Sequence, residues 1–320
     1  MLKKNCFLRI LLLIVILFIW SCKNDKINEV SFGYQPFGSN LPFFIAMEKG
    51  FFEEEGLIVK PVKIVSANDA ANAIINGHIA GNATVPLNVL LNIEENQPGL
   101  MKIFMIKATS SQTWSDYLLV RKGSAIKSIS QLKGKKVGCY PGSAQQTIIK
   151  IILSHFIAKD DFVIVEMPPS TQLQGLDSGQ IDALLTYDDL ALMALENKIA
   201  ETLMENPICK YVVNPLYGFP YVISSDFINE HPKEARKIIR AFYKAADFIR
   251  NNEIEARKIM AKWVGTKIEI ANKVNLWDQI KSEDIKKESL QQLADIFYKY
   301  GVTKKKINTS SLYIELEKIK

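Results

Sequence analysis

The sequence is poor in the side chains that hold metals and form disulfides. Its 320 residues contain four cysteines and three histidines, and their spacing matches no metal-binding motif. Cys6 and Cys22 lie near the N-terminus, so Cys139 and Cys209 are the pair left within the body of the chain. They fit either one disulfide or two separate buried thiols. The sequence therefore predicts neither a disulfide-rich scaffold nor a metal site.

Signatures of catalysis and of nucleic-acid binding are also missing. No Gly-x-Ser-x-Gly motif marks a hydrolase. The net charge of +6 comes partly from the two ends of the chain, and no basic stripe is interleaved with aromatic side chains. We therefore expect no catalytic residue, no cofactor and no nucleic-acid partner.

Long apolar runs are confined to the N-terminus. Three basic residues precede eleven apolar ones, Ile10 to Trp20. A transmembrane helix needs about 20 such residues, so this run is too short to span a bilayer. A short apolar segment between basic and small residues is typical of a cleaved signal peptide. We predict a signal peptide over residues 1–21 and an exported protein.

A cysteine follows this segment directly. Ile19-Trp20-Ser21-Cys22 resembles a bacterial lipobox, although Trp20 is bulky for that motif. The resemblance implies a lipid on Cys22, a lipidated linker over residues 22–29 and an anchor on the outer face of the cytoplasmic membrane or facing the periplasm. The alternatives are an ordinary signal peptide with a chance cysteine and an uncleaved anchor. Both also leave the protein outside the cytosol.

Short strands alternate with helices through the first two thirds of the chain. Helical segments begin near Asn or Pro and end near Gly, and strand-like segments separate them. The expected strands are 30–33, 57–65, 79–83, 101–108, 116–121, 136–140, 163–167, 181–186 and 217–224. The expected helices are 40–50, 68–77, one beginning at 86, 144–155, 171–178, 188–197, 232–251 and 282–299. This alternation predicts an α/β fold with mostly parallel sheets.

Two short sequences occur twice. Residues 76–81 (NGHIAG) match residues 178–183 (SGQIDA), and residues 33–36 (GYQP) resemble residues 138–141 (GCYP). In both pairs a glycine stands at the same kind of junction between a helix and a strand. We interpret this as two similar α/β lobes in tandem, with chance similarity of glycine turns as the alternative.

The extended segments 116–121 and 217–224 are where the chain would enter and leave the second lobe, and they predict a hinge. We expect lobe 1 over 30–115, lobe 2 over 116–216, and a return to lobe 1 over 217–320. The C-terminal helices would then pack on lobe 1.

The sharpest signature is Gly33-Tyr34-Gln35-Pro36 together with residues 40–57 (NLPFFIAMEKGFFEEEGL). It resembles the opening of the nitrate, sulfonate, taurine and thiamine-precursor group of solute-binding proteins. The resemblance continues through 76–80, 116–120, 132–138 and 178–183. It implies the type 2 periplasmic-binding-protein fold, whose two lobes close on a ligand.

The resemblance also implies a function. The protein would be a monomeric substrate-binding lipoprotein of an ABC importer, with a permease and an ATPase as partners. Many relatives have an acidic residue followed by proline after the strand at 181–186, whereas this chain has Tyr187-Asp188-Asp189. The family's ligand contacts are therefore not carried over at that point.

Ligands of open α/β sheets bind beyond the carboxyl ends of the strands. This rule selects loops of both lobes. The candidate ligand-binding residues are Tyr34, Gln35, Asn40, Ser66, Thr84, Thr109, Ser110, Gly142, Ser143, Tyr187, Asp188 and Gly218.

Two of these loops indicate opposite charges. Gly142 and Ser143 stand at a helix start, where free N–H groups favour an anion, unless Ser143 only caps its helix. Asp188 attracts an amine or a ring N–H instead, unless it caps the next helix. Tyr34 and Tyr187 offer flat surfaces to a ring. Together they favour a small polar or heteroaromatic solute over a bare oxyanion.

Three other functions fit parts of the sequence. A thiamine-pyrimidine synthase shares the implied fold, but it is cytosolic and uses a cysteine-rich motif for iron, which this chain lacks. A sensing partner of a membrane receptor would have the same lobes and the same ligand. A structural surface lipoprotein would show no thermal shift with any solute.

Overall fold

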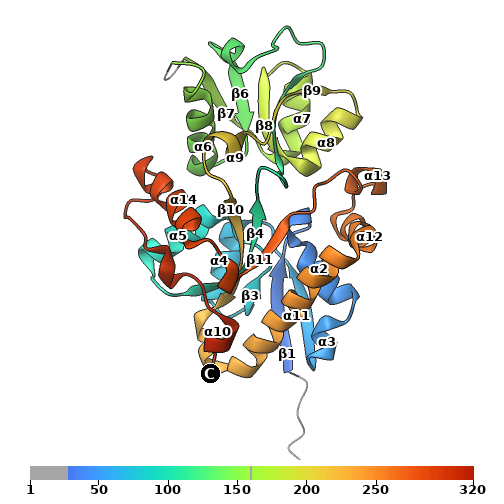
Figure 1. Ribbon diagram of the computed structural model, residues 1–320, viewed down its shortest axis with the longest axis vertical. Helices are drawn as coiled ribbons and strands as arrows, with labels where there is room; N and C mark the ends of the chain where they lie inside the picture. Colours follow the sequence, from blue (N-terminus) through green and yellow to red (C-terminus); the bar gives the residue numbers. More distant parts are fainter. Residues whose placement is uncertain (1–27, 159–160) are drawn as a thin grey trace, which may run out of the picture.

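The computed structural model describes residues 28–158 and 161–320. The predicted signal peptide and the predicted lipidation site Cys22 lie outside these residues, so both stay predictions. The described chain forms two lobes, one above the other, each with its own β-sheet and helices (Figure 1). Every helix in this part of the chain is too short or too polar to cross a bilayer.

The lower lobe is built on a six-stranded sheet with the order β11-β4-β10-β3-β1-β2. The strands are β1 Asn28–Tyr34, β2 Leu57–Lys63, β3 Gly81–Asn82, β4 Met101–Thr109, β10 Leu216–Ser224 and β11 Asp278–Lys281. β1 is parallel to β2 and to β3, and β10 lies antiparallel between β3 and β4. The carboxyl ends of β1 to β4 therefore meet at one edge of the sheet.

The upper lobe repeats this arrangement in five strands, with the order β7-β6-β8-β5-β9. The strands are β5 Asp116–Arg121, β6 Lys136–Cys139, β7 Val163–Glu166, β8 Ala183–Tyr187 and β9 Ala200–Glu205. β6 is parallel to β7 and β8, and β5 is antiparallel between β8 and β9. The two sheet orders correspond strand by strand: β7 is equivalent to β2, β6 to β1, β8 to β3, β5 to β10 and β9 to β4. The two similar lobes predicted from the sequence are confirmed.

The repeated sequence motifs pack in the same way in both lobes. A Cβ atom on Gly33 in β1 would lie 2.8 Å from Cδ1 of Ile79, and one on Gly138 in β6 would lie 2.4 Å from Cδ1 of Ile181. Ile79 and Ile181 are the equivalent residues of the two longer repeats. A side chain at either glycine would force the isoleucine to move, and at Gly33 it would also meet Oδ1 of Asn82 at 2.2 Å.

The chain crosses between the sheets twice. It leaves the lower sheet after Thr109 and joins the upper sheet at Asp116, and it returns between Glu205 and Leu216. The strand that follows each crossing pairs antiparallel with both of its neighbours in the sheet that it enters. Each lobe is therefore completed by a strand that follows directly from the other lobe.

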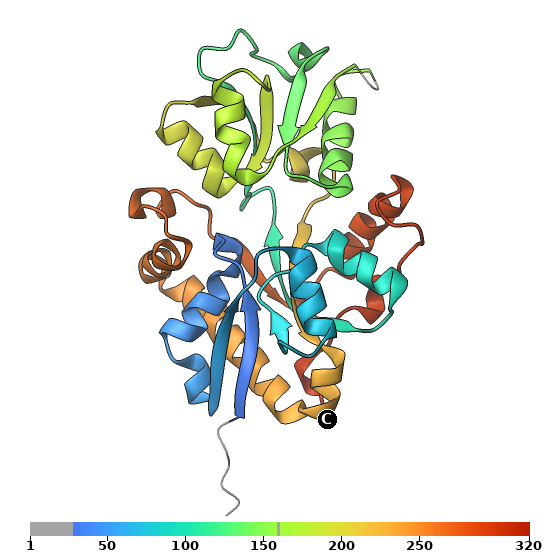
Figure 2. The same ribbon diagram turned by 180° about the vertical axis from the view of Figure 1, so that it is seen from behind.

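Helices cover both faces of the lower sheet (Figures 1 and 2). One layer holds α2 Leu41–Glu48, α3 Phe51–Glu54, α11 Pro232–Asn251 and α12 Glu253–Val264; the other holds α4 Ala67–Ile75, α5 Leu87–Asn96 and α14 Lys287–Lys299. Successive side chains of β10 point to opposite faces of the sheet, so this strand packs against both helix layers. Tyr221 and Ile223 belong to the first core and Val222 to the second. The C-terminal helical part packs on lobe 1, as predicted.

The upper sheet is covered in the same way. α6 Ser143–Ser154 and α9 Pro207–Tyr211 pack on one face, and α7 Pro169–Asp177 and α8 Asp188–Glu196 on the other. In β5, Leu118 and Val120 point into the first core and Tyr117 and Leu119 into the second. Cys139 and Cys209 are buried in this region as free thiols, so the disulfide alternative does not apply.

Several elements differ from the sequence prediction. β3 has only two residues, where residues 79–83 were expected, and β9, α9, β11, α10 Ser225–Glu230 and α13 Ile268–Ala271 were not predicted. α4 begins at Ala67, one residue before the predicted start, because the Ser66 hydroxyl accepts from the Asp69 N–H and the Asp69 carboxylate accepts from the Ser66 N–H.

Candidate functional site

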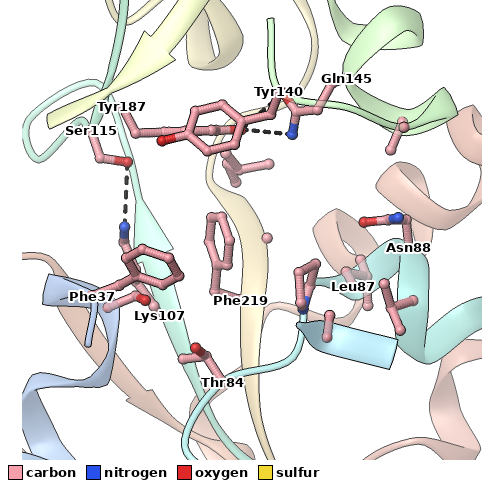
Figure 3. A pocket seen from close by; sticks show the side chains of 18 of the residues that line it. Phe37, Thr84, Leu87, Asn88, Lys107, Ser115, Tyr140, Gln145, Tyr187 and Phe219 are labelled. Atoms are coloured by element: carbon pink, nitrogen blue, oxygen red, sulfur yellow. Dashed lines mark hydrogen bonds between the residues drawn. The ribbon is translucent and has the colours of Figure 1, made fainter. Parts of the chain in front are cut away.

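A cavity of about 390 Å³ lies where the carboxyl ends of the two sets of parallel strands face each other. Both lobes contribute to its wall, and so does Ser115 of the first crossing (Figure 3). Small-molecule sites in proteins typically have volumes of about 300–1,000 Å³, so this cavity has room for a compact solute.

Lys107 is a buried cation in this wall. It belongs to β4 and is 4 % exposed. Its Nζ lies 3.4 Å from the ring centroid of Trp277 and 5.1 Å from that of Phe219, and it donates to Oγ of Ser115 over 3.4 Å. An ammonium has three N–H donors, so Lys107 has donor capacity left for a solute.

Asp188 is the matching buried carboxyl group. It is the first residue of α8 and is 2 % exposed. Its Oδ2 accepts from Nε1–H of Trp277 at 3.0 Å, whereas Oδ1 has no hydrogen-bond partner among the described residues. Burial raises the pKa of Asp188 and lowers the pKa of Lys107, and the attraction between the two charges opposes both shifts. An orphaned carboxylate oxygen in a cavity indicates a missing donor, which a solute N–H can supply.

The start of α8 also joins the two lobes on this side of the cavity. Asp188 contacts Trp277 of the lower lobe, and the backbone N–H of Gly38 donates to the carboxylate of Asp189. Further along α8, Glu196 forms an ion pair with Lys273 next to α13. The lobes are therefore in direct contact at the charged side of the cavity.

Aromatic rings form much of the remaining wall. Tyr187 lies 5.5 Å from Tyr140 and 6.0 Å from Phe219 between ring centroids, and its hydroxyl accepts from Nε2 of Gln145 at 2.9 Å. Burial raises the pKa of Tyr140 to about 12, so its phenol is neutral at physiological pH. Figure 3 shows Phe219 in the middle of the cavity, with Tyr140 and Tyr187 on one side of it and Thr84 on the other.

A buried polar network supports the lower wall. Nδ2 of Asn40 donates to Oγ1 of Thr84 at 2.9 Å, and Oδ1 of Asn40 accepts from the backbone N–H of Gln35 at 3.2 Å. Nδ2 of Asn82 donates to Oε1 of Gln35 at 3.2 Å. The network fixes Gln35 and Thr84, both of which line the cavity.

The structure brings half of the sequence-predicted site residues together in the cavity wall. These are Gln35, Thr84, Gly142, Tyr187, Asp188 and Gly218. Asn40 is fully buried behind them and positions two of them, as described above.

Tyr34 and Ser66 lie elsewhere for clear physical reasons. The Tyr34 ring points into the lower core, 5.4 Å from Phe43 and 5.4 Å from Trp263 between centroids. This follows from the alternation of side chains along β1, which sends neighbouring residues to opposite faces. Ser66 is exposed, and its hydroxyl caps α4.

Thr109, Ser110 and Ser143 also lie outside the wall. Thr109 is 2 % exposed, with its hydroxyl 3.8 Å from Sγ of Cys209. The Ser110 hydroxyl accepts from the backbone N–H groups of the turn that follows it, at the first crossing. Ser143 is exposed at the start of α6 and caps nothing.

The start of α6, which was predicted to bind an anionic group of the solute, already binds the carboxylate of Glu166. Oε1 of Glu166 accepts from the Gly142 N–H at 2.7 Å and from Nε2 of Gln146 at 2.8 Å, and these bonds lower the pKa of Glu166. The protein's own carboxylate therefore occupies the place expected for an anionic solute group.

Sequence reasoning missed several wall residues. Lys107 left a signal, because it is a lysine near the carboxyl end of a mostly apolar strand, directly after the apolar run Ile103 to Ile106. Trp277, Leu293 and Phe297 come from the C-terminal part of the chain, far in sequence from the loops of the strands.

The sequence is similar to a known family and to individual proteins. Residues 39–256 match the family model described as NMT1/THI5 like. A Brucella abortus protein named as a binding protein is 22% identical over 280 residues, covering 84% of this chain and 85% of its own. The 4-amino-5-hydroxymethyl-2-methylpyrimidine phosphate synthase THI13 of Saccharomyces cerevisiae is 22% identical over 233 residues, covering 70% of this chain and 66% of its own.

Solved structures show the same fold. The periplasmic aliphatic sulphonate binding protein SsuA of Escherichia coli superimposes with a TM-score of 0.72 at 15% identity, covering 90% of this chain and 92% of its own. A ligand-binding component of an ABC-type import system from Staphylococcus aureus gives a TM-score of 0.74 at 13% identity, covering 92% and 99%. The two-lobed fold inferred from the sequence motifs is confirmed. Because the family model covers more than half of the chain, this protein belongs to the NMT1/THI5-like family.

Proposed function

We propose that the protein is an extracytoplasmic binding protein that captures a small polar or heteroaromatic solute between its lobes for an ABC importer. The observation that carries this proposal is a cavity walled by both lobes, in which Lys107 has free donor capacity and Asp188 a free acceptor. A solute that contacts both lobes at once stabilises their closed arrangement, and this is how binding is signalled to a transporter.

The relatives support this role. One structural neighbour is named as a periplasmic sulphonate-binding protein and another as the ligand-binding component of an ABC-type import system. A permease and an ATPase would be the partners of a monomeric receptor. A lipid on Cys22 would hold it near them, facing the outside of the cytoplasmic membrane.

The cavity chemistry narrows the solute class. Lys107 is the one basic side chain that the described part of the chain brings to the wall, whereas Asp188 and Asp189 bring two carboxyl groups whose pKa burial raises. This balance disfavours a bare oxyanion and favours a molecule with an acceptor for Lys107 and a donor for Asp188. A 4-aminopyrimidine has both on one edge, a ring nitrogen beside an amino group, and its ring can lie against the aromatic wall. Within the predicted range from nitrate and sulfonates to thiamine precursors, we therefore favour the heteroaromatic end.

We propose that the solute contacts Gln35, Thr84, Gly142, Tyr187, Asp188 and Gly218 of the predicted set. Lys107, Phe219 and Trp277 are added to them by the geometry of the cavity.

A catalytic role like that of the yeast synthase has less support. Burial raises the pKa of Cys139 to about 12 and that of Cys209 to about 11, so neither is a thiolate at neutral pH. We propose that the chain binds its solute without transforming it. A sensing role would use the same cavity, and uptake in vesicles that carry the permease and ATPase separates the two.

The test is solute binding by the purified mature protein. We expect 4-aminopyrimidine to raise the melting temperature, because a ligand at 100 times its Kd adds about 2.7 kcal/mol to stability. Asp188→Asn should weaken binding about tenfold or more, since a hydrogen bond to a charged group contributes about 1.5–3 kcal/mol. Asp182→Asn is the matched control, because Asp182 accepts from the Lys136 N–H outside the cavity wall. Binding of nitrate or sulfate with no response to the pyrimidine would overturn the proposed solute class.

A further inference from the structure

The two ends of the cavity differ in chemistry. The charged residues of its wall, Lys107, Asp188 and Asp189, lie with Trp277 at one end. The other end is formed by Leu87, Val89, Ala144, Ile148, Leu293 and Phe297, and we call this set the apolar arm.

The two ends correspond to the two helix layers of the lower lobe. Trp277 belongs to the core beneath α2 and α11, whereas Leu87, Ile148 and Phe297 belong to the core on the other face of the sheet. Figure 3 shows Phe219 between them, with Lys107 on one side and Leu87 and Asn88 on the other. The cavity therefore runs across the top of the lower sheet, from a charged end to an apolar one.

Both lobes build the apolar arm. Ala144 and Ile148 are four residues apart on α6 of the upper lobe, and Leu293 and Phe297 are four residues apart on α14 of the lower lobe. Residues with this spacing lie on the same face of a helix, so each helix presents an apolar surface to the cavity. α14 lies beyond residues 39–256, which match the family model.

We propose that the apolar arm is a second subsite, which takes an alkyl or aryl substituent attached to the polar head of the solute. The inference rests on the proposed function and extends it to the rest of the molecule that is bound. The arm and the charged end share one cavity, so a single elongated solute fills both. Its walls provide little hydrogen bonding, and apolar atoms gain by leaving water there.

The subsite predicts how affinity depends on chain length. Each methylene group transferred from water to an apolar wall contributes about 0.8 kcal/mol, which is about a fourfold gain in affinity. The gain should continue until the arm is full and then stop, since further methylenes would remain in solvent.

The experiment is calorimetric titration of the full mature protein with 6-alkyl-4-aminopyrimidines from methyl to hexyl. The alkyl group stands on the opposite side of the ring from the donor and acceptor edge, so it can enter the arm while the head stays in place. We expect affinity to rise about threefold to fourfold per methylene over the first members of the series.

Two asparagines of α5 give a matched pair of variants. Asn88 lines the cavity, whereas Asn92, one turn later, lines a separate groove on the outer surface. Asn88 stands between the arm residues Leu87 and Val89, so Asn88→Asp places a charge beside the arm. We expect it to weaken the hexyl compound about tenfold or more and the methyl compound less than about threefold. Asn92→Asp should change neither. Melting temperatures confirm that both variants fold.

The possible results separate the subsite from the proposed function. Binding with no dependence on chain length, or an equal loss for all members in Asn88→Asp, overturns the subsite and leaves the function intact. If no pyrimidine binds, the proposal that the polar head of the solute is a 4-aminopyrimidine fails. The neutral dye N-phenyl-1-naphthylamine then tests the apolar arm alone. Dye fluorescence that Asn88→Asp weakens and Asn92→Asp leaves unchanged supports the arm; no dye binding, or equal binding by both variants, overturns it.

Discussion

The segments that lead from β3 and from β8 into the next helix hold equivalent places in the two lobes, but they bring opposite chemistry to the cavity. The lower segment is Thr84-Val85-Pro86-Leu87. The upper segment is Thr186-Tyr187-Asp188-Asp189, in which β8 runs directly into α8. Pro86 directly precedes α5, and Leu87, the first residue of α5, belongs to the apolar arm, whereas Asp188 and Asp189 begin α8 and belong to the charged end. The shared topology determines where these side chains lie, and their identities determine what they bind.

The buried support of the two segments differs as well. Asn82 in β3 is a buried amide that donates to Gln35 and to the Thr84 carbonyl, whereas its equivalent in β8 is the apolar Leu184. The upper segment has its buried polar contact at Thr186 instead, whose hydroxyl donates to Oε1 of Gln172 at 3.0 Å. Four pairs of positions test how the two lobes differ in stability.

The largest effect is expected at the first residue of β3. A Cβ atom on Gly81 would lie 2.3 Å from the Val222 carbonyl oxygen and 2.7 Å from the Phe32 ring, whereas its equivalent Ala183 already carries one. Gly81→Ala should lower the free energy of unfolding by about 3 kcal/mol or more, since backbone cannot move aside cheaply. Ala183→Gly should lower it by only about 0.5–1 kcal/mol. Urea unfolding measures both, and equal costs would show that the two strands are packed alike.

The strands that follow the two crossings begin with different residues. β10 begins with Leu216 and β5 with the buried Asp116. Burial raises the pKa of Asp116 from its ordinary value of 3.8 to about 6. Because the folded pKa is raised, the native state is favoured below about pH 4 and loses this stability as pH rises through about 6.

In the wild type the Ile208 N–H donates to Oδ2 of Asp116 at 2.8 Å. Asp116→Asn removes the pH dependence of stability, and the amide oxygen of the new side chain can still accept this hydrogen bond. We expect the variant to be up to about 3 kcal/mol more stable than the wild type at pH 8 and equal to it below about pH 4. Unfolding curves at pH 4, 6 and 8 measure the difference. A wild type that is more stable at pH 8 would contradict the expectation.

A smaller effect is expected at Gly142, which occupies the position that Phe37 holds in the lower lobe. Gly142 has a φ of 119°, whereas Phe37 has a φ of −117°, which any residue adopts. Gly142→Ala should lower the free energy of unfolding by about 1–3 kcal/mol through backbone strain alone, because no other atom lies within 4 Å of the added Cβ. No loss of stability would mean that the loop rearranges freely.

The smallest effects are expected at the two serines predicted to bind ligand. The Ser66 hydroxyl caps α4, so Ser66→Ala should lower the free energy of unfolding by about 1 kcal/mol. Ser143 makes no cap, so Ser143→Ala should change it by less than about 0.5 kcal/mol. Neither should alter solute affinity, and a clear loss of affinity in Ser143→Ala would place its hydroxyl in the site.

Local patterns were enough to predict much of the fold. The alternation of strands and helices and the glycine turns follow from features within a few residues of one another. The two-lobed organisation follows from the repetition of such short motifs along the chain. The rule that ligands bind beyond strand ends also uses local information, and it selected Gln35, Thr84 and Asp188, which line the cavity.

The remaining wall depends on contacts between distant parts of the chain. Trp277 lies 170 positions after Lys107, and no local pattern indicates that its ring lies against that ammonium. The two-residue strand β3 was equally hard to predict from the sequence. Its bounds are set by its pairing with β1 and β10 and not by its own residues. Tyr34 was misplaced because the last residue of a strand can point to either face.

The position of β10 has a consequence for how the protein is made. β10 separates β3 from β4 in the lower sheet, but it follows the whole upper lobe in sequence. When a ribosome has completed residues 1–215, the lower sheet still lacks its middle strand, whereas every strand of the upper sheet has already been synthesised. The lobe that begins first must therefore finish second, and a nascent chain stalled before residue 216 would carry a complete upper sheet beside an incomplete lower one.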